Sequence, residues 1–167
     1  GGMTSGVIAD SIVNLCGAIG LGVAMFALHR RDPRGPLTRR LLVMLGIAAV
    51  LFLMRGVAWW AGSAWLDRLS LIPAAAVPLG ALIVTEGILR RHAPRAIKIV
   101  ASAGAGLLSL GCIFGQESYA TLHSLLLSLF LLAGFATCAW LLTTRDRSTL
   151  LASENRGIDR LAVGAIM

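Results

Sequence analysis

Hydrophobic residues occur along this chain in five blocks, which are separated by short polar breaks. Each block has about the 20 residues that an α-helix needs to cross a hydrocarbon layer roughly 30 Å thick. The breaks contain charged residues, glycine and proline, which end helices. The pattern therefore predicts an all-α integral membrane protein, a bundle of five transmembrane helices over residues 7–143. The expected helices cover residues 7–28, 41–62, 71–89, 97–115 and 119–143.

The two ends of the chain lie outside this predicted bundle. Residues 1–6 form an N-terminal tail, and its opening Gly1-Gly2-Met3 is interpreted as a remnant in front of a start methionine. Residues 144–160 are polar, and residues 161–167 are apolar again. Because seven residues cannot span a bilayer, we interpret residues 161–167 as the start of a sixth apolar segment, with a tail on the membrane surface as the alternative.

Composition and charge support a membrane location and predict an orientation. Hydrophobic residues make up 57% of the chain and charged residues 14%, whereas soluble domains have about 25% charged residues. The net charge of +7 does not indicate a nucleic-acid partner, because thirteen of the fifteen basic residues lie in alternate breaks. The positive-inside rule then predicts an outside N-terminus, with residues 144–160 in the cytoplasm, as in a multi-pass protein of a cell inner membrane. The basic residues of these breaks are Arg30, Arg31, Arg34, Arg39 and Arg40, then Arg90, Arg91, Arg95 and Lys98, then Arg145, Arg147, Arg156 and Arg160.

Charged residues inside the expected helices are the main candidates for a binding site. A charge at membrane depth costs a few kcal/mol, so each one calls for a partner or a function. Asp10 and Arg55 have similar expected depths on antiparallel helices, and we predict an ion pair between them, with Asn14 one turn from Asp10. The cluster either lines an outward-facing ligand cavity or fixes the register of the two helices, unless Asp10 stays hydrated and Arg55 extends toward water. Glu86 is expected to pair with Arg90, one turn away.

Proline and small residues predict how the third and fourth expected helices are built. Pro78 removes a backbone hydrogen bond within its helix, which either exposes a carbonyl to a ligand or only bends the helix for packing. Small residues at four-residue spacing let membrane helices approach closely. The fourth expected helix therefore should be the one most enclosed by its neighbours. Its small residues are Ala101, Ala105, Ser109, Gly111 and Gly115.

The sequence contains no pattern that indicates catalysis, a metal or a known cofactor. No phosphate-binding glycine loop, zinc-protease motif or nucleophile elbow is present, so an enzyme is disfavoured, and the cofactor is unknown. Cys16, Cys112 and Cys138 lie in apolar blocks without metal-type spacing. Two histidines that meet inside the bundle could bind haem, but His29, His92 and His123 lie near helix ends.

The outside N-terminus, short outer breaks and basic inner breaks leave three functions open. In this architecture the chain resembles the multi-helix N-terminal sensor regions of bacterial membrane-bound regulators, although no residue motif is shared. Our leading hypothesis is a membrane module for sensing or regulation that binds a small apolar or membrane-borne signal between its helices. The alternatives are an accessory subunit of a larger membrane complex and a transporter or channel protomer. The expected partners are the lipid bilayer and either other membrane subunits or further copies of the chain.

Overall fold

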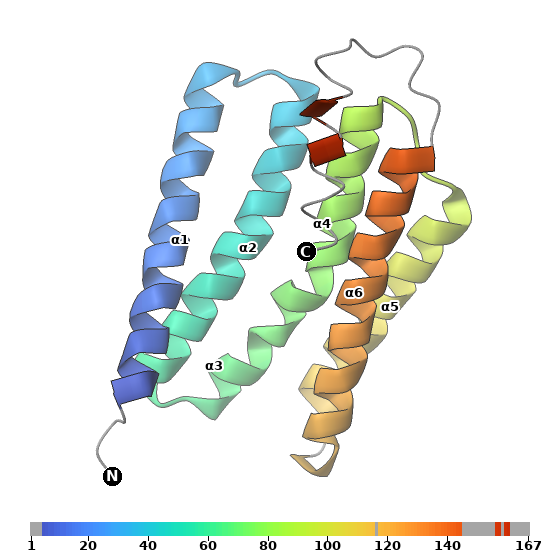
Figure 1. Cartoon of the computed structure of the whole chain (residues 1–167). Coiled ribbons are helices and arrows are strands. Elements are labelled where there is room, and N and C mark those ends of the chain that lie inside the picture. Colours follow the sequence, from blue (N-terminus) through green and yellow to red (C-terminus); the bar gives the residue numbers. More distant parts are fainter. Residues whose placement is uncertain (1–4, 116, 145–155, 158, 161–167) are drawn as a thin grey trace.

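The computed structural model describes residues 5–115, 117–144, 156–157 and 159–160. In these residues every regular element is a helix, and the long helices run up and down side by side (Figure 1). The elements in chain order are α1 (Ser5–Arg31), α2 (Pro36–Ala61), α3 (Ala64–Leu69), α4 (Leu71–Leu89), α5 (Arg95–Phe114), the short 3-10 helix η1 (Glu117–Tyr119) and α6 (Ala120–Thr144).

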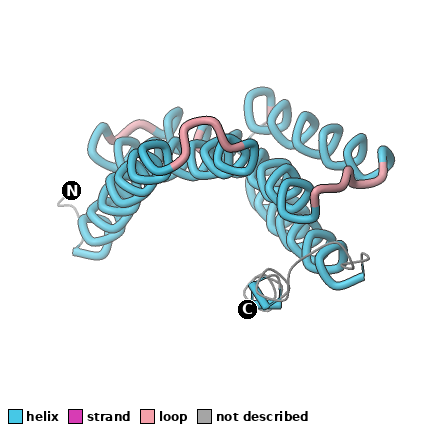
Figure 2. Tube along the Cα trace, turned by 90° about the horizontal axis from the view of Figure 1, so that it is seen from above, coloured by secondary structure: helices cyan, strands magenta, loops and turns pink. Residues whose placement is uncertain are grey.

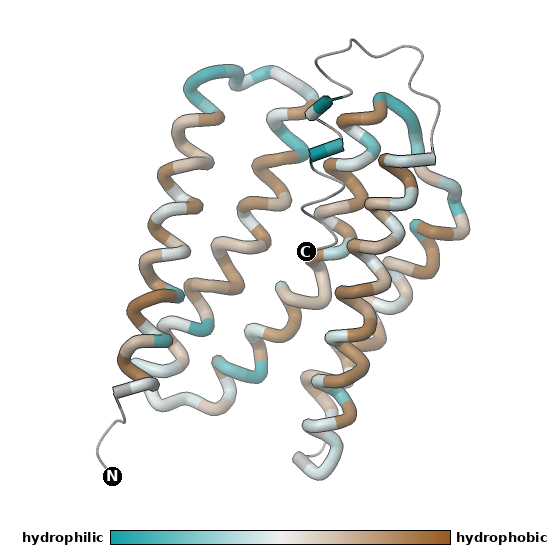
Figure 3. The backbone as a smooth tube through the Cα atoms, viewed as in Figure 1, coloured by the Kyte–Doolittle hydropathy of each residue, from teal (hydrophilic) through white to brown (hydrophobic). Residues whose placement is uncertain are grey.

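The apolar surface of these helices matches a lipid environment. In the described part of the chain, five helical stretches are long and apolar enough to cross a membrane, with α3 and α4 together forming one of them. Their middles are hydrophobic, and hydrophilic residues gather toward the ends (Figure 3). Large apolar side chains such as Val13, Leu107 and Phe114 are exposed, which only lipid or another apolar surface would tolerate. The predicted all-α membrane bundle is thus confirmed, while residues 161–167 lie outside the described residues.

The basic residues between the first two long helices are mostly helical. The sequence pattern ends one helix near residue 28 and starts the next near residue 41, but α1 continues to Arg31 and α2 already begins at Pro36. Proline is well suited to the first turn of a helix, because its missing N–H would have no intrahelical partner there. Asp32 orders the short connection: its carboxylate accepts hydrogen bonds from the Gly35 N–H at 3.0 Å and the Thr38 hydroxyl at 3.4 Å.

The polar stretch after α2 forms a short helix, where the sequence suggested only a turn. The Ser63 hydroxyl accepts a hydrogen bond from the Leu66 N–H at 3.4 Å and so caps α3 at its N-terminus. At the junction with α4, fully buried Ser70 donates from its hydroxyl to the Asp67 carbonyl at 2.5 Å. These side-chain bonds satisfy backbone groups that a break within the membrane would leave unpaired.

The most enclosed helix is α4, and the prediction that residues 97–115 would be most enclosed was wrong. Helix α4 packs against α2, α5 and α6, and more than a third of its most apolar stretch is buried, compared with 11% for α5. Seen from above, the helices form a bent, open arrangement and not a closed ring (Figure 2). Helix α5 contacts α3, α4 and α6, and its buried residues are Ala105 and Cys112.

Close helix contacts depend on glycines that the small-residue pattern did not single out. A Cβ atom on Gly134 of α6 would lie 2.6 Å from the Cβ atom of Pro78 in α4, so the two helices cross there almost in backbone contact. A Cβ atom on Gly56 of α2 would meet Leu15 of α1 at 2.7 Å. Of the small residues predicted to pack in α5, Ala105 is buried, and four are partly buried: Ala101, Ser109, Gly111 and Gly115.

Candidate binding sites between the helices

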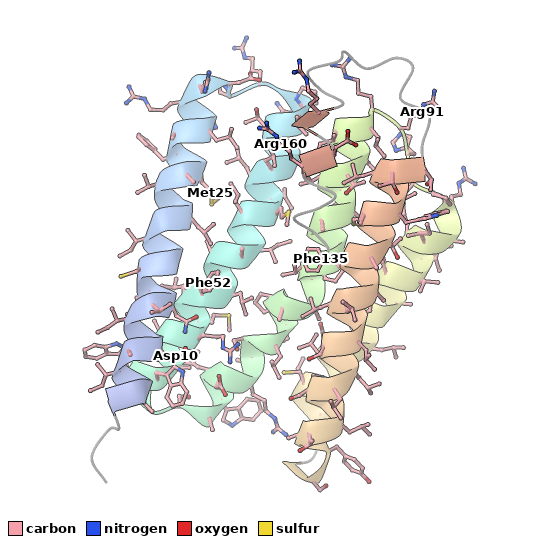
Figure 4. All side chains as sticks on the ribbon, in the orientation of Figure 1. Asp10, Met25, Phe52, Arg91, Phe135 and Arg160 are labelled. Atoms are coloured by element: carbon pink, nitrogen blue, oxygen red, sulfur yellow. The ribbon has the colours of Figure 1, made fainter. Side chains whose placement is uncertain are left out.

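The two ends of the bundle are named here by their connections. The basic end carries the α1–α2 and α4–α5 connections, and the opposite end carries the α2–α3 turn and η1. Arg91, which is labelled in Figure 4, lies at the basic end, and Asp10 lies on α1 toward the opposite end.

The structure does not bring Asp10 and Arg55 together. Both side chains are exposed, and no ion pair among the described residues joins them. The reason is helical phase. Gly56 and Ala58 are the residues of α2 that are buried at this level, and Gly56 faces α1, so Arg55 is rotated about 100° away from α1.

On α1, the residues that face α2 at this level are Ser11 and Asn14, both of which are buried. The Ser11 hydroxyl donates to the Gly56 carbonyl at 3.1 Å, whereas the Asn14 amide donates to the Asp10 carbonyl of its own helix at 2.8 Å. At this level the polar bond between α1 and α2 is thus the neutral one from Ser11 to Gly56, beside the apolar packing of Leu15 against Gly56.

Arg55 lines a cavity at the opposite end, the Arg55 cavity, which has a volume of about 620 Å³. Among the residues that the structure describes, Arg55 makes no hydrogen bond or ion pair. A cation about two turns inside a membrane helix is costly without a partner, so this guanidinium is available to an anion. The cavity is lined by Arg55, Ala64, Trp65, Asp67, Arg68, Leu71, Gly111, Cys112, Gly115, Tyr119, Ala120, Leu122, His123, Ser124 and Leu126.

The wall of the Arg55 cavity is ordered by side-chain bonds to backbone carbonyls. Arg68 donates from Nη2 to the carbonyl of Gly115 at 2.5 Å and so satisfies an end group of α5. His123 of α6 lies 2.8 Å through Nε2 from the carbonyl of Leu108 in α5. Because a carbonyl only accepts, Nε2 is the donor in this bond. A Cβ atom on Gly111 would lie 3.2 Å from the His123 ring, which explains the small residue there.

At the basic end, Glu86 of α4 connects three segments of the chain. Its Oε1 atom accepts from the Ala93 N–H at 2.6 Å and lies 2.5 Å from Nζ of Lys98 in α5. Its Oε2 atom lies 3.9 Å from Arg40 of α2 and 3.8 Å from His92. The carboxylate is buried, so it fixes α4, the α4–α5 connection and α5 relative to one another. The sequence suggested Arg90 as the partner of Glu86 and did not point to Lys98. The proximity of Glu86 and Lys98 depends on the α4–α5 connection, which brings α5 beside α4.

A second large cavity, the basic-end cavity, lies beside Glu86 and also has a volume of about 620 Å³. Its walls come from the start of α2, the end of α4, the α4–α5 connection and Gly157. The lining residues are Pro36, Leu37, Arg40, Glu86, Gly87, Ile88, Arg90, Arg91, His92 and Gly157.

Pro78, a predicted ligand-site residue, lines a third and smaller space. This Pro78 cavity has about 280 Å³ and lies between α4, α5 and α6, with Phe130 and Cys138 among its lining residues. The α-helix continues through Pro78. The lining is almost entirely apolar, so the cavity offers room for a hydrocarbon group but no strong orienting group.

No group of histidine, cysteine and acidic residues suited to a metal ion occurs in the described part of the chain. The comparisons with known proteins add no assignment: no protein-family model, no curated protein and no solved structure matches the sequence. Any proposal about function therefore depends on the cavities and on the charges that line them.

Proposed function

We propose that the chain is a membrane module for sensing or regulation, which binds a small amphipathic anion in the Arg55 cavity. The observation that carries the proposal is the guanidinium of Arg55, which pairs with no described residue and lines a cavity of about 620 Å³ between α2, α3, α5 and α6. Ligand sites are commonly 300–1,000 Å³ and mostly apolar, with a few polar groups that orient the ligand.

The chemistry of the lining indicates the class of ligand. Arg55 can bind a carboxylate or phosphate through two parallel N–H donors. Trp65, Tyr119 and Leu122 offer apolar and aromatic surface to the rest of the molecule, and all three are exposed. A molecule with an anionic head and a short hydrocarbon chain fits both features, and it would reach the cavity from the membrane.

Trp65 can report binding directly, because it is the one tryptophan that lines this cavity. A variant with Phe at the other three tryptophan positions would leave Trp65 as the only indole. Titration with decanoate should then change its emission in a saturable way. Decyltrimethylammonium and decanol, which carry a positive charge and no charge on the same chain, should bind at least tenfold more weakly, since they lose a charge-assisted hydrogen bond.

The matched substitution is Arg55→Gln, with Arg39→Gln at the far end of the same helix as its control. The first should weaken decanoate binding by about tenfold and leave decanol unaffected. The second should change neither. Equal binding of the three probes, or unchanged decanoate binding in Arg55→Gln, would contradict the proposal.

A transporter would move the same ligand across the membrane, whereas a sensing module would only bind it. Proteoliposomes loaded with decanoate distinguish the two functions. We expect the rate of decanoate release to match that of protein-free vesicles. A rate that rises with the amount of protein and falls in Arg55→Gln would favour the transporter.

A further inference from the structure

We propose that the basic-end cavity binds a phosphate-bearing anion, in the form of the phosphorylated headgroup of an anionic membrane lipid. Among the residues that the structure describes, three arginines, one histidine and one carboxylate, that of Glu86, line this cavity. These guanidinium groups lie at the end of the membrane helices, where headgroups lie. Each guanidinium has five N–H donors, so it can bind a phosphate oxygen and a protein group at the same time.

Glu86 makes its closest contacts outside this cavity. Its Oε1 atom is bound by the Ala93 N–H and by Lys98, neither of which lines the cavity. Its Oε2 atom lies 3.9 Å from Arg40 and 3.8 Å from His92, which is beyond hydrogen-bond distance. The carboxylate therefore lies beside Arg40 and His92 without accepting a hydrogen bond from either of them.

Arg40 is held in place before any ligand arrives. Its Nη1 atom donates to the Ile83 carbonyl of α4 at 3.1 Å. Its side chain passes so close to Gly87 that a Cβ atom there would lie 2.8 Å from the Arg40 Cδ atom. A guanidinium has five N–H donors, so one bond to a carbonyl leaves the other groups able to bind phosphate oxygens.

The backbone at the end of α4 brings the remaining cations to the same cavity. Arg90 has a left-handed conformation with φ of 53°, which is uncommon for a residue other than glycine. This conformation ends α4 and turns the chain, so that Arg90, Arg91 and His92 all line one space with Arg40. Strained backbone of this kind is often found at binding sites. Leu37 and Ile88 complete the lining and offer apolar contact to the start of a lipid tail.

Lipid retention tests the proposal on the full chain. The protein would be purified in detergent, mixed with phosphatidylglycerol or phosphatidylcholine, and examined by native mass spectrometry for bound lipid. We expect phosphatidylglycerol to be retained at least tenfold more tightly than the zwitterionic lipid, because only its headgroup has an uncompensated negative charge. Equal retention of the two lipids would overturn the proposal.

Substitutions locate the site, with neighbouring arginines as controls. Arg40→Gln and Arg91→Gln should each weaken phosphatidylglycerol retention about tenfold. Arg39→Gln and Arg95→Gln remove the same charge next to the cavity without touching its lining, and should leave retention unchanged. Arg40 also contacts α4, so Arg40→Gln can unfold the protein. Arg91 is exposed, so Arg91→Gln tests the site even in that case. If all four variants lost phosphatidylglycerol retention equally, the effect would be one of overall charge, and the assignment of the site to this cavity would be overturned.

Soluble glycerol phosphate tests whether the ligand of the basic-end cavity is a lipid headgroup or a free phosphate ester. If the cavity recognises phosphate, glycerol phosphate at millimolar concentration should displace phosphatidylglycerol from the native chain but have no effect on Arg91→Gln. Binding of glycerol phosphate without any preference for phosphatidylglycerol would overturn the lipid assignment. The decanoate titration at Arg55 concerns the other end of the bundle, so either proposal can fail without the other.

Discussion

The charged residues Glu86 and Arg55, at the two ends of the bundle, have opposite surroundings. At the basic end, buried Glu86 is surrounded by Lys98, Arg40 and His92 and by a backbone N–H. At the opposite end, Arg55 makes no ion pair with any described residue and lies in a cavity. A charge that is surrounded by partners stabilises one arrangement of helices, whereas an unpaired charge at membrane depth gains most from a ligand. The comparison therefore separates a carboxylate with several protein partners from a cation that we propose to bind a ligand.

The largest expected effect concerns which end faces the outside of the cell. In a background without Cys16, Cys112 and Cys138, single cysteines would be placed at Ser63 and Ser118, near the opposite end, or at Gly35 and Ala93, near the basic end. An impermeant thiol reagent applied to intact cells should label the first pair fully and leave the second unlabelled, since basic connections stay in the cytoplasm. Labelling at Gly35 with none at Ser63 would show that the orientation is the reverse of the predicted one. The Arg55 cavity would then face the cytoplasm and the basic-end cavity the outside.

An intermediate effect is expected when the carboxylate of Glu86 is removed. Glu86→Gln should lower the free energy of unfolding in detergent by about 2 kcal/mol, between the values for buried and exposed ion pairs, because Lys98 is partly exposed. Chemical denaturation would measure the change. The double variant with Lys98→Gln should lose less than the sum of the single losses, since the two groups are in contact.

The matched control for this substitution is Asp67→Asn, which removes an exposed carboxylate at the opposite end. It should change stability by less than about 0.5 kcal/mol. If Asp67→Asn were as destabilising as Glu86→Gln, the contrast between the two ends would not hold.

The smallest effect is expected for Asp10 and Arg55, the pair that the sequence suggested. Asp10→Asn and Arg55→Gln should each change the free energy of unfolding by less than about 0.5 kcal/mol, because neither side chain has a charged partner among the described residues. Their effects should add, since they do not touch. A coupling above about 1 kcal/mol in a double-mutant cycle would instead show that the two charges pair in the membrane.

The sequence by itself determined the class of fold and most helix positions. Helix α4 begins and ends where its apolar block does, at residues 71 and 89. The same logic failed at residues 29–41, because Arg30, Arg31, Arg39 and Arg40 are compatible with helix ends as well as with a loop. Hydropathy indicates where a helix can be in lipid but says little about its last turns, where charged side chains reach water.

Only the tertiary structure decided which residues form sites. Arg55 could be recognised from the sequence as an unusual charge, but its direction away from α1 depends on Gly56 packing against Leu15. Likewise, Glu86 stood out as an acid in an apolar block, yet its contact with Lys98 requires the turn at Arg90. A pattern along one helix fixes the spacing of side chains, whereas the rotation of that helix and its neighbours is set by close contacts between helices. The cavities exist for the same reason, since each is formed by helices that are distant in the sequence.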